Sequence, residues 1–203
     1  MRSRSSVHLR WCAVVLAVVA SSCGGKAPPP GPGTSLGVPP DLRGSRIMVF
    51  PLQDRAYLSG DADAELAFAL NDRSDEVKWI FPDQLERALA GAPSLNAQTE
   101  RLPVGVFLQA EVRRIGDPLF GILLRLGAVV DGEAALIPIR AVGPVPGVAQ
   151  GTSTLAAALI HVRTGRVLWF GIVEGTSYPP DHPAALPSLM EELARTLLWY
   201  AGE

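Results

Sequence analysis

Cysteine and histidine are scarce in this sequence, which has two cysteines and three histidines among 203 residues. Cys12 and His8 lie within the first 22 residues, so only Cys23, His161 and His182 serve the rest of the chain. Zinc sites need several such ligands at short spacings, which these three residues do not provide. The same count excludes a disulfide framework, so burial of apolar side chains must hold the folded part together.

Familiar catalytic motifs are also missing. The sequence has neither the glycine-rich phosphate loop that ends in lysine nor the serine elbow motif. His161 lies in an apolar segment next to a turn, which favours a structural or surface role over that of a general base. His182 follows Asp181 in a proline-rich loop. We therefore predict no catalytic residue, no cofactor and no metal, and a protein that is not an enzyme.

Basic residues form no stripe along the chain. Without Arg2, Arg4 and Arg10, 15 basic and 20 acidic residues remain. Nucleic-acid-binding domains concentrate lysine and arginine on one face or one helix. We therefore expect no nucleic-acid partner.

The amino terminus has the layout of an export signal. MRSRSSVHLR carries three arginines and no acid, and the following WCAVVLAVVA is wholly apolar. This run is shorter than the roughly 20 residues that a membrane-spanning helix needs. The segment ASSC, which ends at Cys23, resembles the lipobox of bacterial lipoproteins.

The lipobox resemblance implies that Cys23 is lipidated and becomes the first residue of the mature chain. Gly24 stands where aspartate retains some bacterial lipoproteins at the inner membrane, so we expect anchoring at the periplasmic face of the outer membrane. The alternative is plain secretion with an incidental cysteine. An exported chain with one unpaired thiol favours a use for that thiol.

The chain divides into three parts. We predict a signal peptide over residues 1–22, a lipidated cysteine with a spacer over 23–45, and one domain over 46–203. The spacer holds six prolines and six glycines and few large apolar side chains, as is typical of a chain that does not order itself. The 46–203 segment is long enough for one domain with a proper core.

The pattern of apolar residues in the domain predicts an α/β (α+β) fold, in the order β-α-β-α-β-α-β-β-β-α. One mixed sheet of about six strands would be covered by helices. Strands are expected at 46–52, 77–80, 104–112, 134–142, 153–162 and 166–175. Helices are expected at 61–73, 81–91, 117–130 and 186–202.

Four local features refine these expectations. Asp61 and Asp117 are placed to cap their helices. Pro138 cannot donate to a strand ladder, which predicts an edge strand or a bulge. The link Arg163-Thr164-Gly165 predicts a hairpin turn. The apolar 117–130 segment is interpreted as a core-facing helix, with membrane contact as the alternative.

Two stretches resemble a known family. RIMVFPL (46–52) and LIHVRTGRVLWFGIVEG (159–175) resemble the first strand and the closing hairpin of bacterial envelope lipoproteins related to CsgG and LpoB. Where that group often has aspartate near the turn, this chain has His161 or Arg163. The resemblance implies a domain like the TolB N-terminal fold that acts through protein contacts, and it implies no catalytic residues.

These observations lead to one functional hypothesis and two alternatives. The hypothesis is a lipid-anchored, non-catalytic accessory protein of envelope assembly or secretion, which binds the membrane through Cys23 and another envelope protein through its domain. The alternatives are an oligomeric CsgG-like export component and an envelope hydrolase. Candidate contact residues are Asp54 and Arg55, which follow the first strand, and Trp169.

Overall fold

The computed structural model describes residues 35–95 and 97–202. The predicted signal peptide, Cys23 and the start of the predicted spacer lie outside the described residues. The helices and strands are β1 (Ser35–Leu36), β2 (Arg46–Val49), β3 (Arg55–Ala56), α1 (Ala62–Arg73), β4 (Lys78–Ile80), α2 (Pro82–Ala90), α3 (Leu119–Val130), β5 (Ala134–Val142), β6 (Gly151–His161), β7 (Val167–Tyr178) and α4 (Ala185–Leu197). Three short 3-10 helices add η1 (Pro93–Leu95), η2 (Gly105–Leu108) and η3 (Trp199–Gly202).

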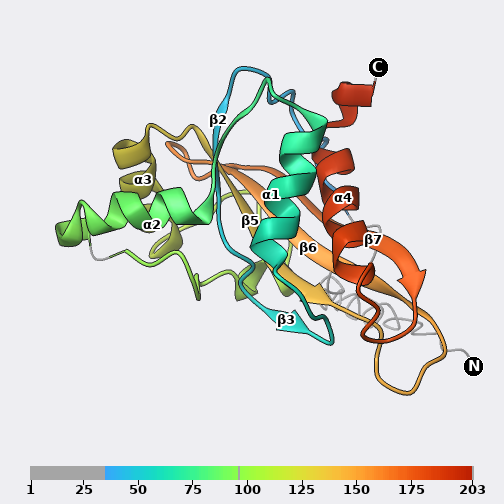
Figure 1. Ribbon diagram of the computed structural model, residues 1–203. Helices are drawn as coiled ribbons and strands as arrows, with labels where there is room; N and C mark the ends of the chain where they lie inside the picture. The colour runs from blue at the N-terminus through green and yellow to red at the C-terminus, as the bar shows by residue number, and fades with distance from the viewer. Residues whose placement is uncertain (1–34, 96, 203) are drawn as a thin grey trace, which may run out of the picture.

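The strands form one mixed sheet of seven strands in the order β1-β7-β6-β5-β2-β4, with β3 also paired to β5 (Figure 1). β2 pairs in parallel with β4 and β5, whereas β5, β6, β7 and β1 pair antiparallel. The predicted fold class is confirmed. The extra strands β1 and β3 are only two residues long, which is too short for a periodic signal.

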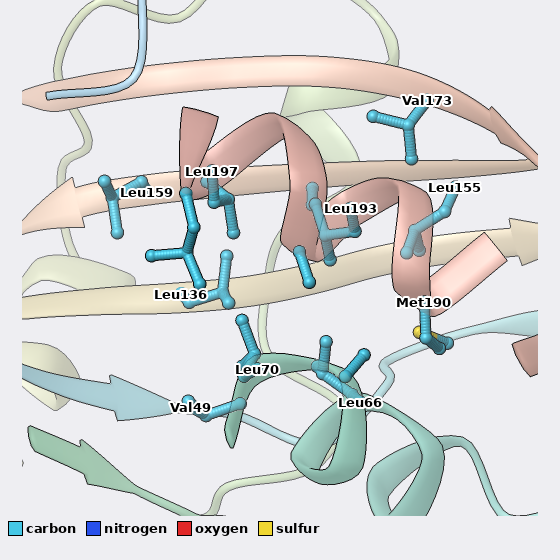
Figure 2. Close-up of a cluster of buried hydrophobic side chains, with 14 of the residues drawn as sticks. Val49, Leu66, Leu70, Leu136, Leu155, Leu159, Val173, Met190, Leu193 and Leu197 are labelled. Carbon is cyan, nitrogen blue, oxygen red and sulfur yellow. The ribbon is translucent and has the colours of Figure 1, made fainter. Parts of the chain in front are cut away.

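Helices cover both faces of the sheet. On one face, α1 and α4 lie side by side and bury Leu66, Leu70 and Leu193 against Leu136 and Leu159 of the strands (Figure 2). The other face packs against α3, as described next. Because most of β5 and residues 155–160 of β6 are buried on both faces, these stretches are almost continuously apolar.

The 119–130 helix is a core element, as predicted. Leu119, Leu123 and Leu126 of α3 pack on the second face of the sheet with Phe107 and Ile160. No helix within the described ranges is long and apolar enough to cross a bilayer.

Local capping follows the sequence signals. The Asp61 carboxylate accepts hydrogen bonds from the backbone N–H groups of Asp63 and Ala64, at 3.2 and 3.1 Å. Asp117 lies just before α3, and its carboxylate accepts from the N–H of Gly121 at 3.1 Å. Both aspartates therefore satisfy donors of a first helical turn, which have no partner within the helix.

The strand predicted over 104–112 is wrong. This segment contains η2, with hydrogen bonds from Phe107 N to Val104 O and from Gln109 N to Val106 O, both 3.1 Å. Val104 and Phe107 are buried, whereas Val106 is 48% exposed. Burial thus follows a spacing of three residues, as in a 3-10 turn, and not the alternation of a strand.

Pro138 marks a bulge but not an edge. β5 lies inside the sheet, and its register with β6 shifts between Pro138 and Arg140. On the other side, β2 ends beside Leu136 and β3 begins beside Ala141. The missing N–H of Pro138 therefore falls in the gap between two partner strands.

The spacer ends earlier than the sequence pattern indicates. Leu36 pairs with Phe170 through β1, and Leu42 is 2% exposed in the core beneath α4. The Trp199 indole N–H donates to the carbonyl of Pro39 at 3.0 Å. Residues 35–45, which we assigned to the spacer, are therefore part of the folded body, because two leucines offset their proline and glycine content.

Candidate functional site

The candidate site lies at the turn between β6 and β7, at the end of the sheet beside α3 (Figure 1). Residues 113–115 run along this turn. Ile115 N donates to Gly165 O at 2.8 Å, and Val167 N donates to Arg113 O at 2.9 Å. These bonds make Arg114 and Arg166 direct antiparallel neighbours. Because the flanking residues make the hydrogen bonds, Arg114 and Arg166 form the pair type whose side chains lie closer together.

His161 extends this row. Its backbone N–H donates to the carbonyl of Arg166 at 2.9 Å, which places His161 opposite Arg166 across the hairpin. Opposite residues of an antiparallel pair project to the same face of a sheet. Arg114, Arg166 and His161 thus form a basic row across three neighbouring chain segments.

A hollow of about 630 Å³ opens over the basic row. It is lined by Arg113, Arg114, His161, Thr164, Arg166 and Leu168. The three arginines and Thr164 are exposed, whereas His161 and Leu168 are half-buried. The Arg114 Nε donates to the carbonyl of Thr164 at 2.9 Å, which fixes the side chain at the rim.

Acidic groups neutralise only part of this charge. Arg113 pairs with Glu111 at 2.7 Å. Within residues 35–95 and 97–202, Arg114, Arg163 and Arg166 form no salt bridge. The hollow therefore presents positive charge to solvent.

A second hollow, of about 480 Å³, shares His161, Thr164 and Leu168 with the first and is also lined by Asp41, Glu133 and Arg163. Hydrogen bonds from the side chain and backbone of Arg43 hold the pKa of Asp41 below its ordinary value. His161 Nδ1 lies 3.3 Å from Thr164 Oγ1. In the described part of the chain, no hydrogen bond joins His161 to Asp41 or Glu133.

Among the residues that the structure describes, no three histidine, cysteine, aspartate or glutamate side chains gather as metal ligands would. His182 stacks on Tyr178 with ring centroids 4.5 Å apart, and its Nδ1 accepts from the N–H of Ala184 at 3.2 Å. His182 therefore stabilises the loop before α4.

The contact residues predicted from sequence lie elsewhere. Asp54 pairs with Arg140 at 3.2 Å, and Arg55 Nη1 donates to the carbonyl of Gly60 at 2.6 Å. Both follow β2 and lie at the end of β5 opposite the hollow. Trp169 is 1% exposed and packs in the core under α4, so packing accounts for it. The structure does not bring these three residues together.

The arginines of the hollow were not predicted as site residues from the sequence. Their only local signals are the Arg113-Arg114 pair and the two arginines that flank Thr164-Gly165. Segment 113–115 meets the hairpin only through the tertiary hydrogen bonds described above, which no local pattern encodes.

No family model matches the sequence, and no curated protein matches it. Among solved structures, the chain is similar to the LpoB C-terminal domain from Salmonella enterica, with 16% identity and a TM-score of 0.45 over 70% of this chain and 87% of that one. It is similar to a PelC dodecamer subunit from Paraburkholderia phytofirmans, with 15% identity and a TM-score of 0.43 over 83% and 94% of the two chains. A lipoprotein from Neisseria meningitidis has 16% identity and a TM-score of 0.35, over 68% and 81%. Scores of this size do not assign a family or a function.

Proposed function

We propose that the protein is a lipid-anchored accessory protein of the bacterial cell envelope, whose domain binds another envelope component and performs no catalysis. The observation that carries this proposal is the order of a basic segment, a short apolar run and small residues before Cys23. A single thiol at that position fits lipid attachment, and the domain needs no cysteine for its own stability.

The fold supports a short linker between Cys23 and the folded domain. Ser35, the first residue of β1, lies twelve residues after Cys23. A fully extended linker of about 3.1 Å per residue would span roughly 40 Å. β1 joins this linker to β7 in the sheet, so the start of the folded domain should lie within about that distance of the bilayer.

The hollow at the β6–β7 turn supports a contact surface. Its exposed arginines suit recognition, because arginine is enriched at binding interfaces and binds planar anionic groups through two parallel hydrogen bonds. A partner with negative groups would complement it.

Site-specific photocrosslinking in living cells tests this proposal. We expect a crosslinker at Thr164 to capture one envelope component, and a crosslinker at Val145, which is 56% exposed in the loop at the opposite end of the sheet, to capture none. Capture should fail in the Cys23→Ser chain, because the domain no longer stays at the membrane. Identical patterns at both positions, or none at either, would refute the proposal.

An envelope hydrolase is the second candidate, because Asp41, Glu133 and His161 line one hollow. Acid–base catalysis needs such groups within hydrogen-bond reach of the substrate. If the hydrolase reading holds, Glu133→Gln and Asp41→Asn should reproduce the phenotype of a gene deletion. The accessory role predicts that both variants behave as wild type.

The export alternative depends on the 118–142 region. In this fold that region forms α3 and β5, whose apolar side chains pack in the core. No observation on the domain favours this alternative over the accessory role.

A further inference from the structure

The pairing of Arg114 with Arg166 places two like charges directly opposite each other. Like charges in opposite positions of an antiparallel pair repel. The hydrogen bonds of Ile115 and Val167 hold both backbones in place, so the two side chains cannot separate by a shift in register. The row continues with His161, and Arg163 lies in the same turn.

Among the described residues, no acidic side chain forms a salt bridge with Arg114 or Arg166 that would offset this repulsion. The Nε of Arg114 is engaged by a carbonyl, and its terminal nitrogens remain available for a ligand. Of the acids on this side of the molecule, Glu111 pairs with Arg113, and Glu133 and Asp41 line the neighbouring hollow. An external anion would therefore find two guanidinium groups without acidic partners in the described part of the chain.

We propose that this hollow binds a phosphate group, as a phosphate monoester or a pyrophosphate. The guanidinium fork matches phosphate oxygens with two hydrogen bonds each. A phosphate monoester carries between one and two negative charges near neutral pH and offers three acceptor oxygens, so one group can neutralise both arginines. A lone carboxylate carries one charge and two oxygens. The Thr164 hydroxyl and the His161 ring, which line the hollow, add further polar contacts.

This inference does not depend on lipid attachment at Cys23. The chain from residue 23 onward, with Cys23→Ser, contains every described residue and serves for the test. Failure of phosphate binding and failure of anchoring would thus be seen in separate experiments.

Titration calorimetry with pyrophosphate at low salt is the direct test. We expect saturable binding of one pyrophosphate per chain. The double variant Arg114→Gln with Arg166→Gln should weaken binding at least about tenfold, because each arginine supplies charge-assisted hydrogen bonds. The matched control, Arg55→Gln with Arg140→Gln, removes the same charge at the opposite end of the sheet and should change affinity less than about twofold.

Replacement of both arginines by lysine separates recognition from net charge. Lysine keeps the charge but lacks the planar fork, so affinity should fall between wild type and the glutamine variant. Equal affinity of the lysine and wild-type chains, or an equal loss in the Arg55/Arg140 control, would show general charge attraction and overturn the proposal.

Vesicles distinguish a lipid headgroup from a free phosphate. Phosphatidylcholine vesicles would carry either phosphatidic acid, a phosphate monoester, or phosphatidylglycerol, a diester, at equal surface charge. Arginine-dependent sedimentation with phosphatidic acid alone assigns the site to a lipid monoester, and pyrophosphate binding without sedimentation assigns it to a soluble phosphate. Binding to neither pyrophosphate nor phosphatidic acid would overturn the proposal.

Discussion

Asp63 is an acidic residue whose negative charge is disfavoured by burial in the folded protein. It lies in the first turn of α1, half-buried, and its carboxylate accepts the backbone N–H of Leu52 at 3.1 Å. Burial raises the pKa of the Asp63 carboxyl, the Leu52 hydrogen bond opposes this shift, and the nearby acids Asp61 and Glu100 add to it. Protonation of Asp63 is therefore more favourable in the folded state than in the unfolded chain.

Asp63→Asn should for this reason stabilise the protein at neutral pH. The stability that protonated Asp63 provides is present below the pKa of the unfolded carboxyl and is lost as the pH rises through the pKa of the folded one. Asparagine keeps an acceptor for Leu52 and stays neutral. We expect equal Tm values for variant and wild type near about pH 3 and a higher Tm for the variant near about pH 7. A gap that narrows as the pH rises would contradict this account.

At the scale of elements, the β6–β7 turn depends both on its own backbone conformation and on contacts with segments that are distant in the sequence. Gly165 has φ +66°, in the left-handed region, and a Cβ there would lie 3.0 Å from Phe120 Cδ2 and 3.2 Å from Ile115 Cγ1. The turn could be predicted from the glycine between two apolar runs. Its contact with α3 and segment 113–115 could not, because those partners are distant in sequence.

Gly165→Ala should destabilise the domain by about 1–3 kcal/mol, through backbone strain and the close contacts. Gly44→Ala is the matched control: Gly44 has φ +75°, but its added Cβ meets nothing within 4 Å. We expect Gly165→Ala to cost more in urea unfolding than Gly44→Ala. Equal losses of unfolding free energy would mean that the side chains around Gly165 move aside without a measurable cost, which would contradict this prediction.

The segment before β2 also acts as an element of the fold. Leu42→Ala should lower the free energy of unfolding by about 2–4 kcal/mol, because its side chain is buried at 2% exposure. Val38, in the same segment, is 77% exposed, so Val38→Ala should change stability by less than about 0.5 kcal/mol. Chemical unfolding of both variants checks this, and a silent Leu42→Ala would place residues 35–45 outside the folded body.

The helices could be predicted from the sequence, but the irregular 104–112 segment could not. α1, α2 and α4 each have a periodic apolar face and local end signals such as Asp61 or Gly91, which act within one segment. The 104–112 segment alternates like a strand, yet the buried positions of Val104 and Phe107 are set by the sheet beneath them. Tertiary packing overrides local pattern there.

At the scale of the whole molecule, the two ends of the sheet carry different polar groups. Asp54 and Arg55 occupy one end with their polar groups paired, and the arginine row occupies the other. Arg114 and Arg166 are 52 positions apart in the sequence, and each looks like an ordinary surface residue in its own segment. The candidate site therefore emerges only from the fold, whereas the anchor is predicted by a contiguous segment.

The intact mass of the protein purified from bacterial membranes tests the central claim, that Cys23 is a lipid anchor, most directly. We expect a mature chain that begins at Cys23 and carries a diacylglyceryl group, with no such species in the Cys23→Ser variant. A mature chain with an unmodified amino terminus, released in soluble form, would contradict it.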